Sequence, residues 1–237
     1  RRTSLEEQRR IATGIQSLVP GMSSNGDSGG ITGGTGGMAG FIHGGRASDS
    51  RTLHDGINTG WAGANSNAAV SNVAGSQETV LTVSGGLGEA ETAGAVLNII
   101  PRDGGNQFSG TFFVSGAGGG MQGSNYTDEL KTAGLRSPAE LKKVYEFNPM
   151  GGGKIIQDKL WFYGTYREVV AENTIPGIFF NKNAGDPTKW LVDFDTSRPS
   201  FGDSLTRNAI GRLTWQVSPR NKVSFSHSQQ YDRQNKA

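Results

Sequence analysis

The C-terminal half of this 237-residue chain alternates apolar and polar residues in five segments, and this pattern restricts the possible folds more than any other feature. In one segment, Leu213 and Trp215 fall on one face, while Arg212 and Thr214 fall on the other. Successive side chains of a β-strand point to opposite faces, so a period of two predicts strands with one apolar and one polar face. The five segments are 106–116, 145–156, 159–169, 208–217 and 222–231. Each is close to the ~9–11 residues with which a strand crosses a bilayer.

The connections between these segments alternate strictly between short and long. Only a few residues, around 157–158 and 218–221, join the second segment to the third and the fourth to the fifth. Long polar loops, 117–143 and 170–207, join the others, and the sequence Ser137-Pro138-Ala139-Glu140 predicts a helix start in the first loop. A membrane barrel has short periplasmic turns and long extracellular loops, whereas both ends of a soluble sheet face water. The pattern therefore favours an antiparallel transmembrane β-barrel, of which about five strands are present. A soluble antiparallel sheet with one buried face shows the same alternation and remains the alternative.

The N-terminal part has the mixed character of a small α+β unit. Residues 1–16 predict a helix, because their first turn has the spacing of a capping box. The Gly-, Ser- and Thr-rich stretch 21–40 predicts a loop. Short apolar runs with turn-rich flanks predict three strands, at 40–43, 79–83 and 96–100. The character changes after Gly105, so we place a domain boundary there, with 1–105 as one domain and 106–237 as the other.

Several motifs occur along the chain in a characteristic order. Ile42–Arg46 is followed by Leu53–Ile57, and Gly88–Arg102 ends in an aliphatic stretch with Asn and a basic residue. Segments 158–168 and 208–222 follow in the C-terminal half. Together these motifs resemble the TonB-dependent outer-membrane receptors, most closely the Oar-like branch. The first three resemble the signature and the end of the plug domain, and the last two resemble early strands of the barrel. The resemblance implies an α+β plug domain followed by the first strands of an incomplete β-barrel.

The match to this family is incomplete. His43 stands where the plug signature usually has Arg, and Ala95 replaces the second Gly of a Gly-Gly pair. The TonB box, which the energy-coupling protein grips, is not found in the sequence. The alternation gives five strands, whereas transporter barrels have about 22. An open edge exposes unpaired backbone groups that hydrocarbon does not tolerate. We therefore expect a fragment, truncated at both ends, that does not insert on its own.

The resemblance also implies the function. It implies capture of an extracellular ligand and energy-coupled uptake across the outer membrane of a Gram-negative bacterium. The partners would be a TonB-type periplasmic energy-coupling protein, outer-membrane lipid and a ligand that the sequence does not identify. No covalent chemistry is involved, so we expect no enzyme activity and no catalytic, cofactor-binding or metal-binding residues. A surface adhesion or protein-secretion factor on the same scaffold is one alternative, and a soluble all-β binding module or hydrolase is another. The net charge of +2 gives no electrostatic case for nucleic acid.

Some residues match chemical motifs without the context that those motifs need. Ser28 lies in Gly-Asp-Ser-Gly-Gly, but no His precedes it and both flanks are loop-like, which disfavours a catalytic serine. His43 and His54 are 11 residues apart, but this is not a recognisable ligand spacing, so we interpret them as polar residues of the plug. Arg46 and Asp55 could form an ion pair within the plug. Four aromatic residues are candidates for girdles at the membrane interface, with packing against the plug as the alternative. These are Trp161, Tyr163, Tyr166 and Trp215.

Overall fold

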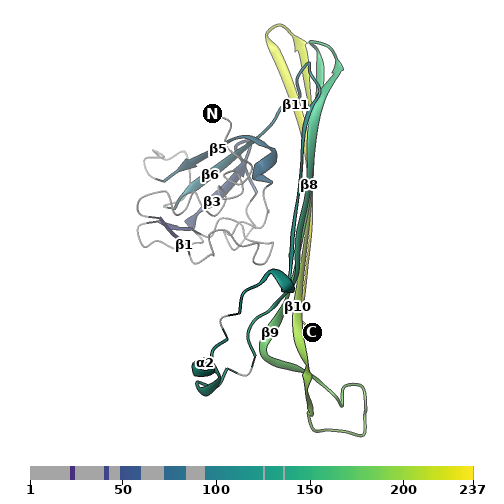
Figure 1. Ribbon diagram of the computed structural model, residues 1–237. Coiled ribbons are helices and arrows are strands. Elements are labelled where there is room, and N and C mark those ends of the chain that lie inside the picture. The colour runs from purple at the N-terminus through teal and green to yellow at the C-terminus, as the bar shows by residue number, and fades with distance from the viewer. Residues whose placement is uncertain are drawn as a thin grey trace.

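The structure of the protein, a computed structural model, contains a large β-sheet, a small β-sheet and a two-stranded pairing of β1 with β2 (Figure 1). It describes residues 22–24, 40–42, 49–59, 72–83, 94–124, 126–135 and 137–236. The large sheet has five antiparallel strands in the order β11-β10-β9-β8-β7, and the small sheet has four in the order β4-β3-β6-β5. Within the described residues, no helix is long and apolar enough to span a membrane.

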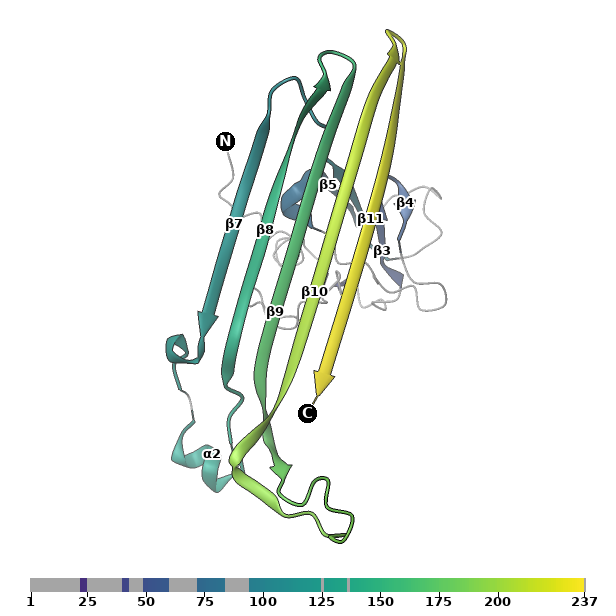
Figure 2. The same cartoon turned by 90° about the vertical axis from the view of Figure 1, so that its right-hand side faces the viewer.

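The large sheet is a simple meander in which each strand pairs with the next along the chain (Figure 2). Its strands are β7 (Ser109–Gly118), β8 (Leu141–Ile156), β9 (Leu160–Asn181), β10 (Phe194–Ser218) and β11 (Asn221–Lys236). All five strands predicted from the alternation are therefore present. Both predicted tight turns are present as well, and Asp158 in the first of them has a positive φ of 59°. The antiparallel sheet confirms the predicted mainly antiparallel β fold of this half.

Two of the five strands are much longer than predicted. The expected loop 170–207 is wrong over most of its length, because β9 and β10 extend the ladder and leave only residues 182–193 between them. This part of the sequence lacks a clear apolar face, which is why no period of two was visible. Cross-strand ion pairs stabilise the pairing instead, as between Glu168 and Arg207, whose Nε lies 2.7 Å from the carboxylate.

The connection between β7 and β8 contains a helix at a different place from the predicted one. Helix α2 (Asp128–Thr132) is capped by Thr127, whose hydroxyl accepts a hydrogen bond from the Leu130 amide at 3.4 Å. The predicted helix start at Ser137-Pro138-Ala139-Glu140 is wrong. The Glu140 amide donates to Thr174 Oγ1 at 2.7 Å, and the Thr174 amide donates to the Glu140 carbonyl, so β9 holds this segment in an extended conformation. A 3-10 turn, η3 (Gly119–Met121), directly follows β7.

The small sheet belongs to an N-terminal unit, which we define as the described residues before Arg102. It comprises β3 (Arg51–His54), β4 (Ile57–Asn58), η2 (Val73–Gly75), β5 (Ser76–Thr82) and β6 (Val96–Pro101), and β3 and β6 pair in parallel. Leu97 and Ile99 form its core, with Leu81 packed against them. Asp55 and Gly56 turn β3 into β4 with φ values of 53° and 79°, as a two-residue hairpin turn of type I′ requires.

Most of the remaining N-terminal predictions lie outside the described residues. This holds for the helix 1–16 and for most of the loop 21–40. Within that loop, residues 22–24 form a short strand, β1 (Met22–Ser24), which pairs with β2 (Gly40–Ile42), so the loop prediction is wrong there. The strands predicted at 40–43, 79–83 and 96–100 correspond to β2, β5 and β6. The pairing of β1 with β2 arises from long-range contacts, which local composition does not reveal.

The two faces of the large sheet differ in polarity in the sense opposite to a soluble domain. The inward face, on which the N-terminal unit lies in Figure 1, buries mainly polar side chains: Glu146, Asn148, Thr165, Thr206, Asn208, Arg212 and Thr214. Met150, Tyr163, Val169 and Ala171 are buried on the same face. The outward face exposes large apolar side chains: Phe108, Phe112, Val114, Phe147, Leu213, Trp215, Val217, Val223 and Phe225. For Phe112 and Trp215 the exposed fractions are 63% and 53%. Water does not favour such a surface, so the outward face requires an apolar environment.

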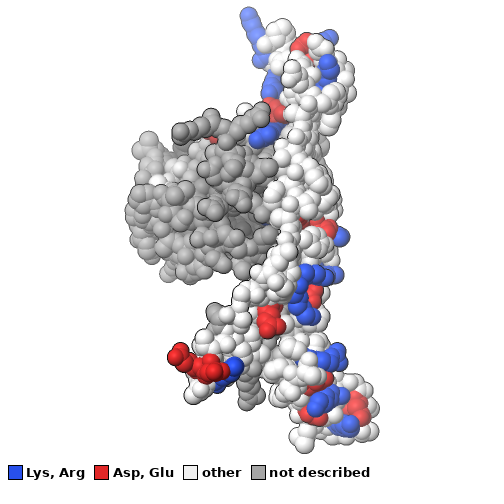
Figure 3. Space-filling view, in the orientation of Figure 1, with Lys and Arg blue, Asp and Glu red and all other residues white. Residues whose placement is uncertain are grey.

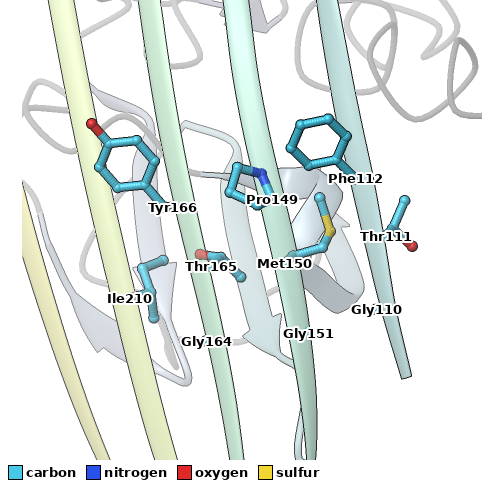
Figure 4. A pocket seen from close by; sticks show the side chains of 10 residues that line it. All are labelled: Gly110, Thr111, Phe112, Pro149, Met150, Gly151, Gly164, Thr165, Tyr166 and Ile210. Atoms are coloured by element: carbon cyan, nitrogen blue, oxygen red, sulfur yellow. The ribbon is translucent and has the colours of Figure 1, made fainter. Parts of the chain in front are cut away.

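A shallow depression crosses this outward face (Figure 4). Gly110 pairs with Gly151, Gly151 pairs with Gly164 and Gly164 pairs with Gly211, so four neighbouring strands lack a side chain at the same level. Phe112 and Tyr166 line the depression, and Phe147 contacts both rings, with centroids 5.3 and 6.2 Å away. The glycines therefore leave a gap beside a row of aromatic rings.

Candidate functional site

The strongest contact between the N-terminal unit and the sheet is made by Arg212. The alternation of β10 turns this side chain inward, where it is only 9% exposed. Its Nη1 atom lies 2.7 Å from Asp55 Oδ2, and its Nε atom lies 2.7 Å from Asp103 Oδ1. Asp55 lies at the tip of the β3–β4 turn, and Asp103 lies just after β6. One guanidinium group therefore ties two separate points of the N-terminal region to the centre of β10.

Asp103 links this contact to a second strand of the sheet. It accepts hydrogen bonds from Thr214 Oγ1 at 3.0 Å and from Lys222 Nζ on β11 at 2.5 Å. Burial alone would raise the pKa of Asp103, but the hydrogen bonds from Lys222, Thr214 and Arg212 together lower it. The carboxylate is therefore ionised at neutral pH, and its charge is balanced by two cations.

A second contact joins the N-terminal unit to β8. Asn72 and Asn148 exchange two hydrogen bonds between their amide groups, at 2.9 and 3.0 Å, and Asn148 is 1% exposed. Asn148 also donates to Glu146, which forms an ion pair with Arg167 at 3.0 Å. This reciprocal amide pair fixes the register of the two parts, because a small shift would break both of its bonds at once.

Close backbone approach accompanies these polar contacts. A Cβ atom at Gly75 would lie 2.5 Å from Thr165 Cγ2, so only glycine allows η2 to approach β9 this closely. The linker between β6 and β7 is held to the sheet by hydrogen bonds. Asn106 Oδ1 accepts hydrogen bonds from Trp161 Nε1 at 2.8 Å and from the Asp158 amide at 2.9 Å. The linker is thereby fastened to the turn between β8 and β9.

The interface is polar rather than a continuous apolar core. Among the described residues, six buried side-chain polar atoms have no protein hydrogen-bond partner: Thr52 Oγ1, Tyr163 OH, Thr165 Oγ1, Ser200 Oγ, Thr206 Oγ1 and Asn208 Oδ1. The arrangement holds the two parts in one relative position through a small number of specific bonds.

The structure brings together only some of the residues that stood out in the sequence. Asp55 pairs with Arg212, while Ser28, His43 and Arg46 lie outside the described residues. Burial lowers the pKa of His54, which is therefore neutral at neutral pH. The described part of the chain contains no group of three or more His, Cys, Asp or Glu side chains that could hold a metal ion.

The four aromatic residues considered for interfacial girdles divide between the two faces. Trp161 contacts the linker through Asn106, and Tyr163 is buried with an exposed fraction of 7%. These two therefore pack against the N-terminal region, whereas Tyr166 and Trp215 lie on the outward face. Arg212 was not predicted from the sequence as a binding residue. A charged residue in the middle of an otherwise uncharged alternating strand was the available signal.

The comparisons with known proteins agree with this architecture. No protein-family model matches the sequence. The TonB-dependent transporter Oar of Myxococcus xanthus is 23% identical over 197 residues, which cover 78% of this chain and 18% of the transporter. The crystal structure of the siderophore receptor PirA from Acinetobacter baumannii superposes with a TM-score of 0.61 and 16% identity, over 94% of this chain and 29% of the receptor. The chain is a relative of the TonB-dependent receptors.

The resemblance to TonB-dependent receptors that the sequence motifs indicated is thus confirmed. With it, the assignment to the outer membrane of a Gram-negative bacterium and to a class of proteins that are not enzymes is confirmed. The chain spans less than a third of the length of either relative. The fold likeness extends over both the N-terminal unit and the large sheet, so the two parts occur together in the structure of the siderophore receptor.

Proposed function

We propose that this chain is part of a longer TonB-dependent transporter that captures a ligand outside the cell and takes it up by energy-coupled transport. In this proposal, residues 1–105 form the plug and residues 106–237 form the first strands of the barrel. The observation that carries the proposal is the reversed polarity of the large sheet, whose polar face binds the N-terminal unit and whose apolar face is exposed. A plugged barrel in a bilayer needs this arrangement.

The outward face has the dimensions of a membrane-facing band. From Ala209 to Val217, the outward residues of β10 carry no charge. This distance is about 26 Å along the strand at ~3.3 Å per residue. A strand tilt of ~40° reduces it to about 20 Å along the membrane normal, compared with the ~25 Å of outer-membrane barrels. The two outer strands of the sheet, β7 and β11, have unpaired edges among the described residues, and hydrocarbon requires further strands to pair with them.

The polar interface suits a plug that must move. Separation of an apolar core exposes apolar surface to water. Separation of an interface made of hydrogen bonds and ion pairs costs less free energy, because water replaces the lost partners. A pull on the chain before β3 would act on the Asp55–Arg212 pair and on the Asn72–Asn148 pair. We propose that release of these contacts opens a path past the sheet for the ligand.

The membrane topology of the full-length protein tests the first part of this proposal. Trp190 lies in the 182–193 loop and Asn221 is the first residue of β11, next to the β10–β11 turn, so the two lie at opposite ends of the sheet. In intact cells, a membrane-impermeant maleimide should label the variant Trp190→Cys. It should label Asn221→Cys only after the outer membrane is permeabilised. Equal labelling of the two variants in intact cells, or recovery of the protein in the soluble fraction, would reject the membrane assignment.

Energy coupling requires a separate test. Asn148 is almost fully buried under the N-terminal unit, so the thiol of an Asn148→Cys variant should react slowly in resting cells. In the native host, a proton gradient should accelerate its labelling, and a protonophore should abolish this acceleration. Trp190→Cys is the matched control, because the Trp190 side chain that it replaces is 92% exposed. Its labelling rate should be the same with and without the proton gradient. Identical labelling of Asn148→Cys with and without the gradient would contradict plug displacement.

A further inference from the structure

A belt of four cations crosses the outward face of the sheet on the loop side of its apolar part. The cations are Lys142, Lys143, Arg207 and Arg233, and they come from strands β8, β10 and β11. Lys142 and Lys143 both bind Glu172, at 3.1 and 3.2 Å, because a β-bulge after Leu141 lets both side chains reach the same carboxylate. We call this set of residues, with their carboxylate partners, the cationic belt.

The cations of the cationic belt are more exposed to the surroundings than their carboxylate partners. Each cation is 41–57% exposed, whereas its carboxylate partner, Glu168, Glu172 or Asp203, is only 15–18% exposed. Four cations face three carboxylates, so the belt has a positive excess of one charge. An approaching molecule therefore meets the cations first, while the carboxylates behind them hold the cations in place.

The position of the belt relates it to the edge of the apolar band. Tyr145 OH and Tyr166 OH donate hydrogen bonds to the two oxygens of Glu168, at 2.9 and 3.0 Å, and Arg207 Nε binds the same carboxylate. Phe147 pairs directly with Glu168 in the register of β8 and β9, so apolar and charged residues meet at this level. Tyrosines of this kind lie at the membrane–water interface. In Figure 3, the surface of the sheet is white through its middle, and charged side chains gather toward the loop end.

We propose that the cationic belt binds the phosphate groups of anionic lipid headgroups in the leaflet on the loop side. This inference rests on the proposed insertion of the sheet into the outer membrane. A phosphate carries negative charge and accepts several hydrogen bonds, which matches exposed guanidinium and ammonium groups at headgroup depth. Arg207 binds its carboxylate through Nε and is half-exposed, so its terminal amino groups can donate to a phosphate. The lipid would thereby fix the height and tilt of these strands in the membrane.

Lipid association with the full-length protein tests this proposal. The protein is reconstituted in phosphatidylcholine vesicles that contain a trace of spin-labelled phosphatidic acid or diacylglycerol, which differ only in the phosphate. The wild type should hold phosphatidic acid more strongly than diacylglycerol. In the variant Lys142→Gln/Lys143→Gln/Arg207→Gln, the ratio of the two association constants should fall by roughly fivefold per cation removed, until it reaches one.

The matched control removes three cations from the loop end, in Lys182→Gln/Lys189→Gln/Arg198→Gln, and should keep the wild-type ratio. Lys142→Arg/Lys143→Arg keeps the charges and should also keep the ratio, which separates a lipid contact from a general loss of structure. Equal retention of the two probes by the wild type, or the same loss in the loop variant as in the belt variant, would overturn the proposal. If the maleimide test shows no membrane insertion, the proposed function fails. If insertion is normal and the ratio is one, only the belt proposal fails.

Discussion

The inward and outward faces of the five-stranded sheet are built from the same strands, yet they differ in the kind of contacts that they make. The inward face makes specific bonds, such as those of Arg212 and Asn148, and tolerates few changes in geometry. The outward face makes no such bonds over its apolar band and presents aromatic and aliphatic side chains at large exposure. In a soluble domain the apolar face would be the covered one. The difference shows that this sheet needs two surroundings, a polar partner on one side and an apolar medium on the other.

A charge placed on each face gives the sharpest test of this comparison. Leu213→Arg puts a cation in the middle of the apolar band and should destabilise the inserted protein by ~2–4 kcal/mol. Ser224→Arg puts the same residue on the inward-facing side of β11, at a position exposed in the described structure, and should cost under ~1 kcal/mol. The measurement is urea unfolding from phosphatidylcholine vesicles. Similar losses for the two variants would remove the distinction between the faces.

Removal of the central inward contact should have the next largest effect. Arg212→Leu leaves Asp55 and Asp103 without their shared cation. Loss of one partner from a fully buried pair costs ~3–5 kcal/mol, but both carboxylates are partly exposed here, so we expect about 1–3 kcal/mol. Hydrogen exchange of the β3 and β4 amides should accelerate accordingly, while exchange in the β8–β9 ladder stays unchanged. Arg220→Leu, in the β10–β11 turn, is the control and should leave both regions unaffected.

A steric clash introduced between η2 and β9 should weaken the attachment of the N-terminal unit by a smaller amount, and a second substitution should reverse this loss. Gly75→Ala introduces a methyl group 2.5 Å from Thr165 Cγ2 and should weaken the attachment of the N-terminal unit by about 1 kcal/mol. Thr165→Ser removes the opposing methyl group. The double variant should therefore recover most of the loss, which a double-mutant cycle of hydrogen-exchange rates would measure. Simple additivity of the two changes would argue against a direct contact.

The pH dependence of the same interface should be the smallest effect. Because the pKa of Asp103 is lowered in the folded protein, its contribution is complete above the unfolded value of ~3.9 and is lost as the pH falls through the folded value. Exchange of the β3 and β4 amides, after correction for intrinsic rates, should therefore accelerate below about pH 4, in addition to the acceleration below pH 7 that the lowered pKa of His54 in β3 produces. Asp103→Asn should show faster exchange at pH 7 and a weaker change on acidification. An unchanged acid response in this variant would assign the effect to other groups.

The strands of the apolar band could be predicted from the sequence because the solvent on each face imposes a period of two. Segment 208–217 is the clearest case, with apolar residues outward and Arg212 and Thr214 inward. The continuation of β10 back to Phe194 could not be predicted, because beyond the band both faces are polar and the period disappears. The helix start expected at Ser137 failed for a different reason. Its local signature was overridden by the hydrogen bonds between Glu140 and Thr174, which are 34 residues apart.

The contacts of the candidate site were less accessible to sequence reasoning than the fold. From the sequence, the carboxylate of Asp55 could be paired only with nearby cations such as Arg46. Its partner in the structure, Arg212, is 157 residues away. The pairing of Asn72 with Asn148 spans 76 residues and involves side chains that are common in loops. Such partners are set by the placement of the N-terminal unit on the sheet, which no local pattern encodes.

The unusual length of β9 and β10 has a mechanical consequence. Beyond Tyr166, at the edge of the aromatic row, β9 continues for 15 residues to Asn181, or about 50 Å at ~3.3 Å per residue, and it pairs with β10 as far as Thr174 and again at 179–181. The tip that carries Trp190 is therefore held by a two-stranded extension of the sheet and not by a long flexible loop. The conformational entropy of most of this segment is already lost when the sheet forms, so a ligand that binds the tip has to order only the few residues at its end.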